Sequence, residues 1–274
     1  MNLKPYFRRM VALPNEHGAW VFLLSPLLIG LFAAGHFTLA SALLIVAALA
    51  AFLLRQPVSI LVKAYSGRRP RTDLPAARFW MIVYGLIGLL ALVGLIFQGH
   101  SYLLLLALPG IPVFLWHLYL VSRRAERRQA GVEIIASGVL ALSAPGAYWV
   151  GIGNPDPTGW WLFALCWLQS AASIVYAYLR LAQRELKEMP DRPTQIRMAW
   201  RALIYTTFNM AAVLDLSILA ILPQYLFLPY LLQWLETLWG TLNPAVGVKP
   251  TRIGLRQLAV SSLFTLLFIL TWSI

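Results

Sequence analysis

Long apolar stretches recur along the chain and are separated by short polar connections. A helix crosses a bilayer with about 20 mostly apolar residues, and nine stretches fit this requirement. The predicted spans are residues 18–34, 37–54, 79–97, 101–121, 134–152, 159–179, 202–222, 225–242 and 257–274. The eighth span is the weakest, because Pro229 and Glu236 interrupt it. The pattern predicts an all-α polytopic membrane protein in which residues 1–274 form a single integral membrane domain.

The basic residues fall in alternate connections between the predicted spans. All 22 Lys and Arg residues lie before the first span or in the connections that follow the second, fourth, sixth and eighth spans. The connections 35–36 and 153–158 hold none. Because basic connections stay on the cytoplasmic side of a membrane, we expect a cytoplasmic N-terminus. The odd number of spans then places the C-terminus outside.

The composition excludes several classes of protein. Hydrophobic residues make up 60% of the chain and charged residues 12%, which is about half the charged share of soluble domains. A soluble enzyme and a disordered chain are therefore excluded. The single cysteine, Cys166, provides neither a disulfide framework nor a cysteine-built metal site. The net charge of +12 does not indicate nucleic-acid binding, because the cations lie at helix ends.

Two basic connections, after the second and sixth spans, begin as continuations of a helix and carry polar residues four positions apart. This spacing places their side chains on one face of each helix. The first stripe is Arg55, Ser59 and Lys63, and the second stripe is Tyr176, Arg180 and Arg184. Cations at the cytoplasmic mouth of a bundle suit a phosphate or a carboxylate, so we expect both stripes to converge on one anion-binding cavity. The alternative is that they set the topology and attract acidic lipid headgroups.

Nine helices with two large inner connections, after the second and sixth, resemble the UbiA-type intramembrane prenyltransferases. The segment 67–74, Gly-Arg-Arg-Pro-Arg-Thr-Asp-Leu, resembles the stretch that follows the first aspartate motif of that family. The resemblance implies a bundle that holds an isoprenyl diphosphate through Mg²⁺. The aspartates of that family's two motifs are absent here. Arg55, Ser59 and Lys63 stand at the first motif, and Tyr176, Arg180 and Arg184 stand at the second. Since Mg²⁺ needs oxygen ligands, we expect no metal ion at this site. We also expect no other cofactor, and we expect the side-chain cations to contact the anion directly.

A second resemblance lies near the N-terminus. The string Pro-Asn-Glu-His-Gly-Ala-Trp at 14–20 is followed by Ser-Pro-Leu-Leu-Ile-Gly at 25–30, and Arg-Gln-Pro at 55–57 closes the second span. These features resemble the YwiC-like membrane proteins. The resemblance implies a multi-pass protein of the bacterial inner membrane and no particular activity.

Three further polar residues are candidates for chemistry. Glu16 and His17 stand at the start of the first span, where an acid caps the helix and is favoured by its dipole. The alternative is an acid–base pair that faces the bound anion, which makes Glu16 and His17 the candidate catalytic residues. Asp215 lies within the seventh span. It is a candidate proton site, because intramembrane carboxylates are rare and costly.

Three functions remain open. The first is binding of a membrane lipid or lipid-like substrate, with a metal-independent transfer reaction if the protein is an enzyme. The second is a small-anion or proton-coupled transporter that uses Asp215 and the proline-interrupted fourth and fifth spans. The third is a non-catalytic subunit of a membrane complex. None of the three has nucleic acid as a partner.

Overall fold

Leu and Ala, which are strong helix formers, dominate the apolar stretches, and the structure folds these stretches as helices. This computed structural model describes residues 9–14, 17–123 and 129–273, and no strand occurs in these ranges. The elements are α1 (Arg9–Ala12), α2 (His17–Ala34), α3 (Leu39–Tyr65), η1 (Arg71–Asp73), α4 (Leu74–Phe97), η2 (Ser101–Leu103), α5 (Leu104–Ser122), α6 (Ala130–Ala141), α7 (Ser143–Ile152), α8 (Pro157–Arg184), α9 (Arg192–Ile218), α10 (Phe227–Leu242) and α11 (Pro250–Trp272).

The helices confirm a polytopic membrane protein. Within the described residues, six helical segments are long and apolar enough to cross a membrane by length and composition. They are α3, η1 with α4, η2 with α5, α6 with α7, α8 and α11. The apolar part of α2, Gly18–Ala34, is shorter. Each of the nine predicted spans coincides with a helix or, for the fifth span, with the pair α6 and α7. The number of spans and the side of each terminus stay predictions.

The two proline-interrupted spans behave differently in the structure. The fifth span is divided at Leu142, between α6 and α7. The fourth span is not divided, because α5 continues through Pro109 and Pro112 as one helix. Proline removes one backbone donor and bends a helix without necessarily ending it. The prolines of the fourth span are therefore tolerated within one helix.

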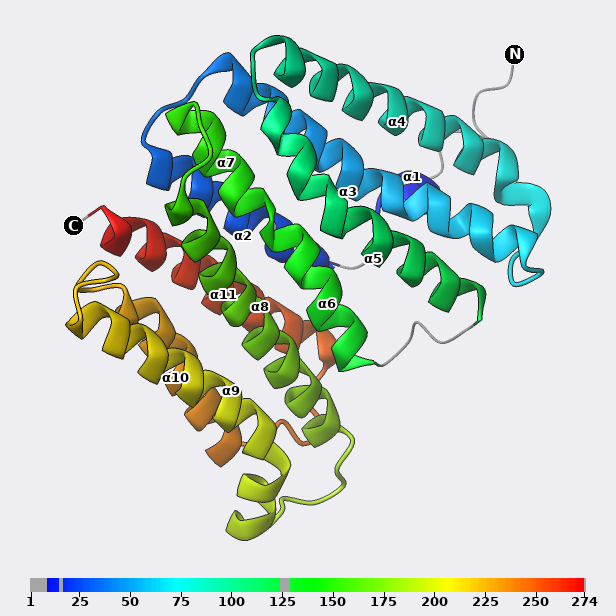
Figure 1. The fold of residues 1–274 in the computed structure, drawn as a ribbon. Helices are drawn as coiled ribbons and strands as arrows, with labels where there is room; N and C mark the ends of the chain where they lie inside the picture. The colour runs from blue at the N-terminus through cyan, green and yellow to red at the C-terminus, as the bar shows by residue number, and fades with distance from the viewer. Residues whose placement is uncertain (1–8, 15–16, 124–128, 274) are drawn as a thin grey trace.

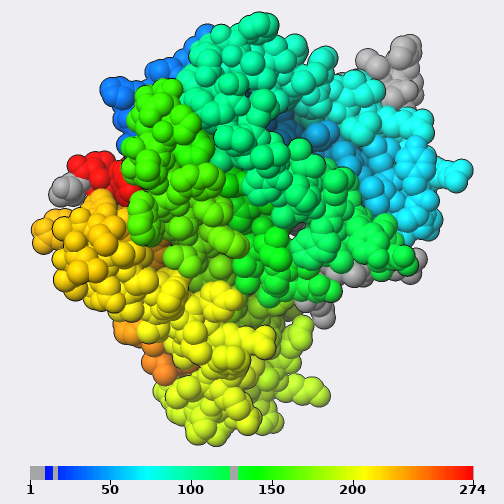
Figure 2. All heavy atoms as spheres, in the orientation of Figure 1, coloured from blue at the N-terminus to red at the C-terminus, as the bar shows by residue number. Residues whose placement is uncertain are grey.

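The helices alternate in direction, so their ends gather on two opposite sides of the molecule (Figure 1). We call the side where α3, α5, α8 and α10 finish and α4, α6, α9 and α11 begin the basic end. From α2 onward, every Lys and Arg that the structure describes lies in a connection at this end or in the adjoining half of a helix. The α8–α9 connection and the start of α9 project from the body of the molecule at the lower edge of Figure 2.

The helix α2 packs against α6, α7, α8 and α11, while Leu24, Leu28 and Phe32 remain exposed along it. Small residues allow this close packing. A Cβ atom at Gly30 would lie against the backbone oxygen of Ala144 and the Cβ of Ala147, and both of these alanines are fully buried on α7. Gly30 is therefore required for the approach of α2 to α7.

We predict that Gly30→Ala lowers the free energy of unfolding by about 1–3 kcal/mol, the usual cost of overpacking a core. The matched control is Gly85→Ala on α4, where an added Cβ meets nothing within 4 Å. Thermal unfolding in detergent measures both variants. Equal unfolding temperatures for the two would contradict the close contact between α2 and α7.

The orientation can be tested with single-cysteine variants in a Cys166→Ala background. Asn154 and Lys187 are exposed in connections on opposite sides of the molecule. We predict that a membrane-impermeant maleimide labels Asn154→Cys in intact spheroplasts and labels Lys187→Cys only after permeabilisation. The reverse pattern would overturn the orientation inferred from the basic residues.

Candidate functional site at the basic end of the bundle

The last turns of α8 place a buried guanidinium against the end of α10. Arg180 is 6% exposed, and its Nη1 donates to the carbonyl oxygens of Gly240 at 2.7 Å and Asn243 at 2.8 Å. The same nitrogen donates to Oε1 of Gln183 at 2.8 Å. The last carbonyls of a helix have no partner within the helix, and a cation there is favoured by the helix dipole. Arg180 therefore caps the C-terminus of α10.

A carboxylate beside this cap joins three helices. Glu236 of α10 accepts a hydrogen bond from the Tyr176 hydroxyl of α8 at 2.9 Å. It also accepts two from Arg256 of α11, each at 2.7 Å. Such bidentate pairs are among the stronger polar contacts in proteins. At Gly240, a Cβ atom would lie against the Tyr176 hydroxyl, so this glycine allows the three helices to meet.

One aromatic ring, that of Trp239, lies close to both guanidinium groups of this cluster. The Cζ atoms of Arg256 and Arg180 lie 3.3 Å and 5.4 Å from the ring centroid of Trp239. Both distances are within the range of a cation–π interaction. Glu236 pairs with Arg256, whereas Arg180 donates to backbone carbonyls and to Gln183, so the cluster has two cations and one acid.

The connection between α10 and α11 is held by the same part of α8. The backbone N–H of Ala245 donates to Oε1 of Gln183 at 3.3 Å. Nε of Arg184 donates to the carbonyl of Val248 at 3.3 Å, and the N–H of Gly247 donates to the carbonyl of Arg184 at 3.3 Å. Gly247 has φ +65°, a conformation that favours glycine. The second stripe therefore fixes the end of α10 and the connection that follows.

A hollow of about 530 Å³ opens beside this connection. Its lining comes from the connection and from the first turns of α11: Val246, Gly247, Val248, Lys249, Thr251, Arg252 and Leu255. Two cations and three apolar side chains thus share one wall. None of these residues was a candidate on the basis of spacing.

The first stripe lies on a different part of the bundle. Arg55, Ser59 and Lys63 are half-buried along α3, and the Cζ of Arg55 lies 5.8 Å from the ring centroid of Phe52. The helix packs most extensively against α4. In the following connection, Arg69 donates to Asp73 at 2.8 Å. Six cations and one acid lie between residues 55 and 78, so this segment keeps a large positive charge.

The two stripes lie on different helices, α3 and α8. The start of α6 lies between the last turns of α3 and α8 in Figure 1, and α8 packs against α6, α7 and α9. The two hollows that we describe are lined by other residues. The convergence of the stripes on one cavity stays a prediction.

The candidate catalytic pair lies at the limit of what the structure describes. Glu16 lies outside the described residues. The backbone of His17 begins α2, but its side chain is not described. Their role as an acid–base pair stays a prediction. Among the described residues, no group of three His, Cys, Asp or Glu side chains is placed to hold a metal ion.

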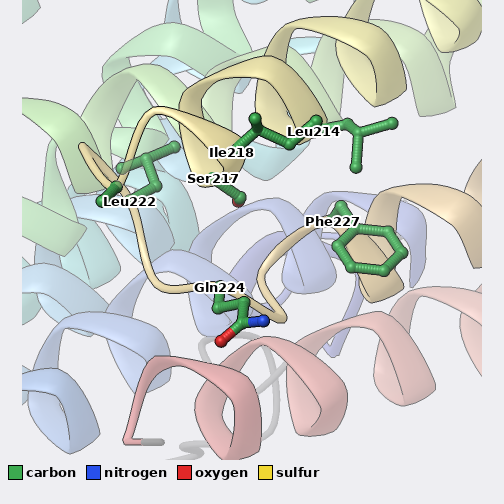
Figure 3. A pocket seen from close by; sticks show the side chains of 7 residues that line it. Leu214, Ser217, Ile218, Leu222, Gln224 and Phe227 are labelled. Carbon is green, nitrogen blue, oxygen red and sulfur yellow. The ribbon is translucent and has the colours of Figure 1, made fainter.

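Asp215 lies at the opposite end of the molecule, in the last turns of α9, with an exposed side chain. A hollow of about 430 Å³ lies close by, between the end of α9 and the α9–α10 connection. Its walls include Leu214, Ser217 and Gln224, and Figure 3 shows the connection curving past the last turn of α9. Asp215 is not among the residues that line it. Its role as a proton site stays a prediction.

Sequence reasoning missed the Glu236–Arg256 pair and the cations that line the hollow. The available signal was Glu236 itself, because an acid within an apolar span needs a partner. Its partner Arg256 is 20 residues away on the next helix. Spacing within one helix cannot reveal such a contact.

We predict that Arg180→Gln lowers the free energy of unfolding by about 1–3 kcal/mol, because the capped carbonyls of α10 lose a buried donor. The control is Arg197→Gln, which removes an exposed cation from the start of α9. Unfolding by SDS, followed by circular dichroism, compares the two variants with the parent. Equal stability of Arg180→Gln and Arg197→Gln would show that the cap contributes little.

Comparison with known proteins supports one of the two resemblances. Residues 13–148 match the sequence model of a family described as YwiC-like protein. A protein of Bacillus subtilis (strain 168), "Uncharacterized protein YwiC", is 29% identical over 185 residues, which cover 64% of this chain and 68% of the relative. No solved structure matches the chain, and the resemblance to the UbiA-type enzymes stays a prediction. The family match contains the first stripe and ends before the second. Over residues 13–148, this polytopic helical membrane protein is identified as a member of the YwiC-like family.

Proposed function

We propose that this protein binds an anionic amphiphile at its basic end, in the cytoplasmic membrane of a bacterium. The amphiphile is a lipid or isoprenoid that carries a phosphate or carboxylate. The observation that carries the proposal is the composition of residues 55–78, on α3 and the connection that follows, where the sequence holds six cations and one acid. A positive surface of this kind attracts anionic groups by about 1 kcal/mol per cation near a membrane.

The surfaces next to these cations suit an acyl or isoprenoid tail. Ile82 near the start of α4 and Leu115 near the end of α5 are exposed in the half of each helix that adjoins the basic end. In a bilayer, such surfaces contact hydrocarbon. An amphiphile can therefore place its tail along these helices and its headgroup at the basic end.

The headgroup contacts side-chain cations directly in this proposal. A guanidinium presents several N–H donors in a plane that matches a phosphate or a carboxylate, and the ammonium of Lys63 adds a mobile point charge. A transfer reaction on the bound lipid is a further step, in which the same cations stabilise developing negative charge. Among the described residues, no feature favours the transporter or the assembly subunit over binding.

Native mass spectrometry of the purified protein tests the proposal. After delipidation, the protein is exposed to equal amounts of phosphatidylglycerol, which is anionic, and phosphatidylcholine, which is zwitterionic. We predict preferential retention of phosphatidylglycerol. The double variant Arg55→Gln, Lys63→Gln should reduce this retention by roughly thirtyfold, because two contacts of about 1 kcal/mol each are lost.

The matched control is Arg197→Gln, Arg201→Gln, which removes two exposed cations from α9 at the same end of the molecule. This control should retain phosphatidylglycerol nearly as well as the parent. Equal retention of the two lipids by the parent protein would overturn the proposed function.

A further inference from the structure

The hollow beside α11 is the only one of the two described hollows that combines cations with apolar walls. We propose that it holds the phosphate of a lipid headgroup, with Lys249 and Arg252 in contact with the phosphate oxygens. This inference rests on the proposed function and gives the same class of ligand a second place of binding. It adds a site that lies outside both stripes.

The charges around the hollow are not balanced by acids. Glu236 is the carboxylate of the neighbouring cluster, and both of its oxygens already accept from Arg256. Within the described part of the chain, Lys249 and Arg252 form no ion pair, and both are exposed. Two positive charges therefore face the hollow without a neutralising side chain, which favours an anionic occupant.

The shape and the apolar lining suit a lipid headgroup. A volume of about 530 Å³ lies within the range of small-molecule sites. Val246, Val248 and Leu255 add apolar surface next to the cations. A free phosphate would use the cations alone, whereas the glycerol and first methylene groups of a lipid would also contact these side chains. The lining therefore favours a lipid phosphate over the free ion.

The wall of the hollow is held in place by α8. Gly247 and Val248 line the hollow. The backbone N–H of Gly247 donates to the carbonyl of Arg184, and the side chain of Arg184 donates to the carbonyl of Val248. Gln183 holds Ala245 at the start of the same connection. A site with a fixed wall loses less entropy when it binds a ligand than a mobile loop does. The second stripe thus supports this site without contacting the ligand.

The test compares two double variants that lose the same charge at the same end of the protein. Lys249→Gln, Arg252→Gln removes the two cations of the hollow, and Arg197→Gln, Arg201→Gln is the control. Titration with phosphatidylglycerol in native mass spectrometry gives the dissociation constant of each protein. We predict an increase of roughly thirtyfold for the hollow variant and of less than about threefold for the control, whose cations do not line the hollow. A thermal unfolding measurement on each variant checks that it is folded.

Each outcome has a distinct meaning. An equal increase in both variants would overturn the inference, because it would show general attraction to a cationic surface. An unchanged constant in the hollow variant, with phosphatidylglycerol still preferred over phosphatidylcholine, would overturn the inference and leave the proposed function standing. No preference in the parent protein would overturn both. Displacement of the lipid by an equimolar amount of inorganic phosphate would show that the site recognises the free ion and would contradict the lipid assignment.

Discussion

The contact of Arg180 with the end of α10 is the interaction on which the basic end depends. In an environment with little water, backbone carbonyls at a helix end need donors from elsewhere in the protein. One guanidinium from α8 supplies donors to two such carbonyls, those of Gly240 and Asn243. This contact fixes where α10 ends, and therefore where the connection to α11 begins.

The adjoining cluster extends this contact to α11. Glu236 receives donors from Tyr176 and from Arg256, so α8, α10 and α11 are joined around one carboxylate. A buried charge is costly unless it is paired and hydrogen-bonded, and Glu236 meets both conditions. Lys249 and Arg252, on the first turns of α11, lie outside this cluster and line the hollow.

The sequence predicts the membrane class and the helices well, because apolar length directly reflects the thickness of the bilayer. It is less informative about helix ends. The expected continuation of the second span as a helix past Arg55 is confirmed, since α3 ends at Tyr65, whereas the seventh predicted span ends at residue 222 and α9 already ends at Ile218. Four-residue spacing correctly places Arg180 and Arg184 on one helix face, but it does not show that both bind the protein's own backbone. That information depends on how α8, α10 and α11 pack, since the contacts join residues about 60 positions apart.

The most direct measurement is a cryo-electron microscopy structure of the protein in nanodiscs that contain phosphatidylglycerol. The account predicts headgroup density within hydrogen-bond distance of Lys249 and Arg252, beside a connection held by Arg184. It also predicts that Arg180 remains on the carbonyls of Gly240 and Asn243. Ordered headgroup density bound to Arg180 in place of those carbonyls, or an empty hollow with lipid ordered elsewhere, would contradict it.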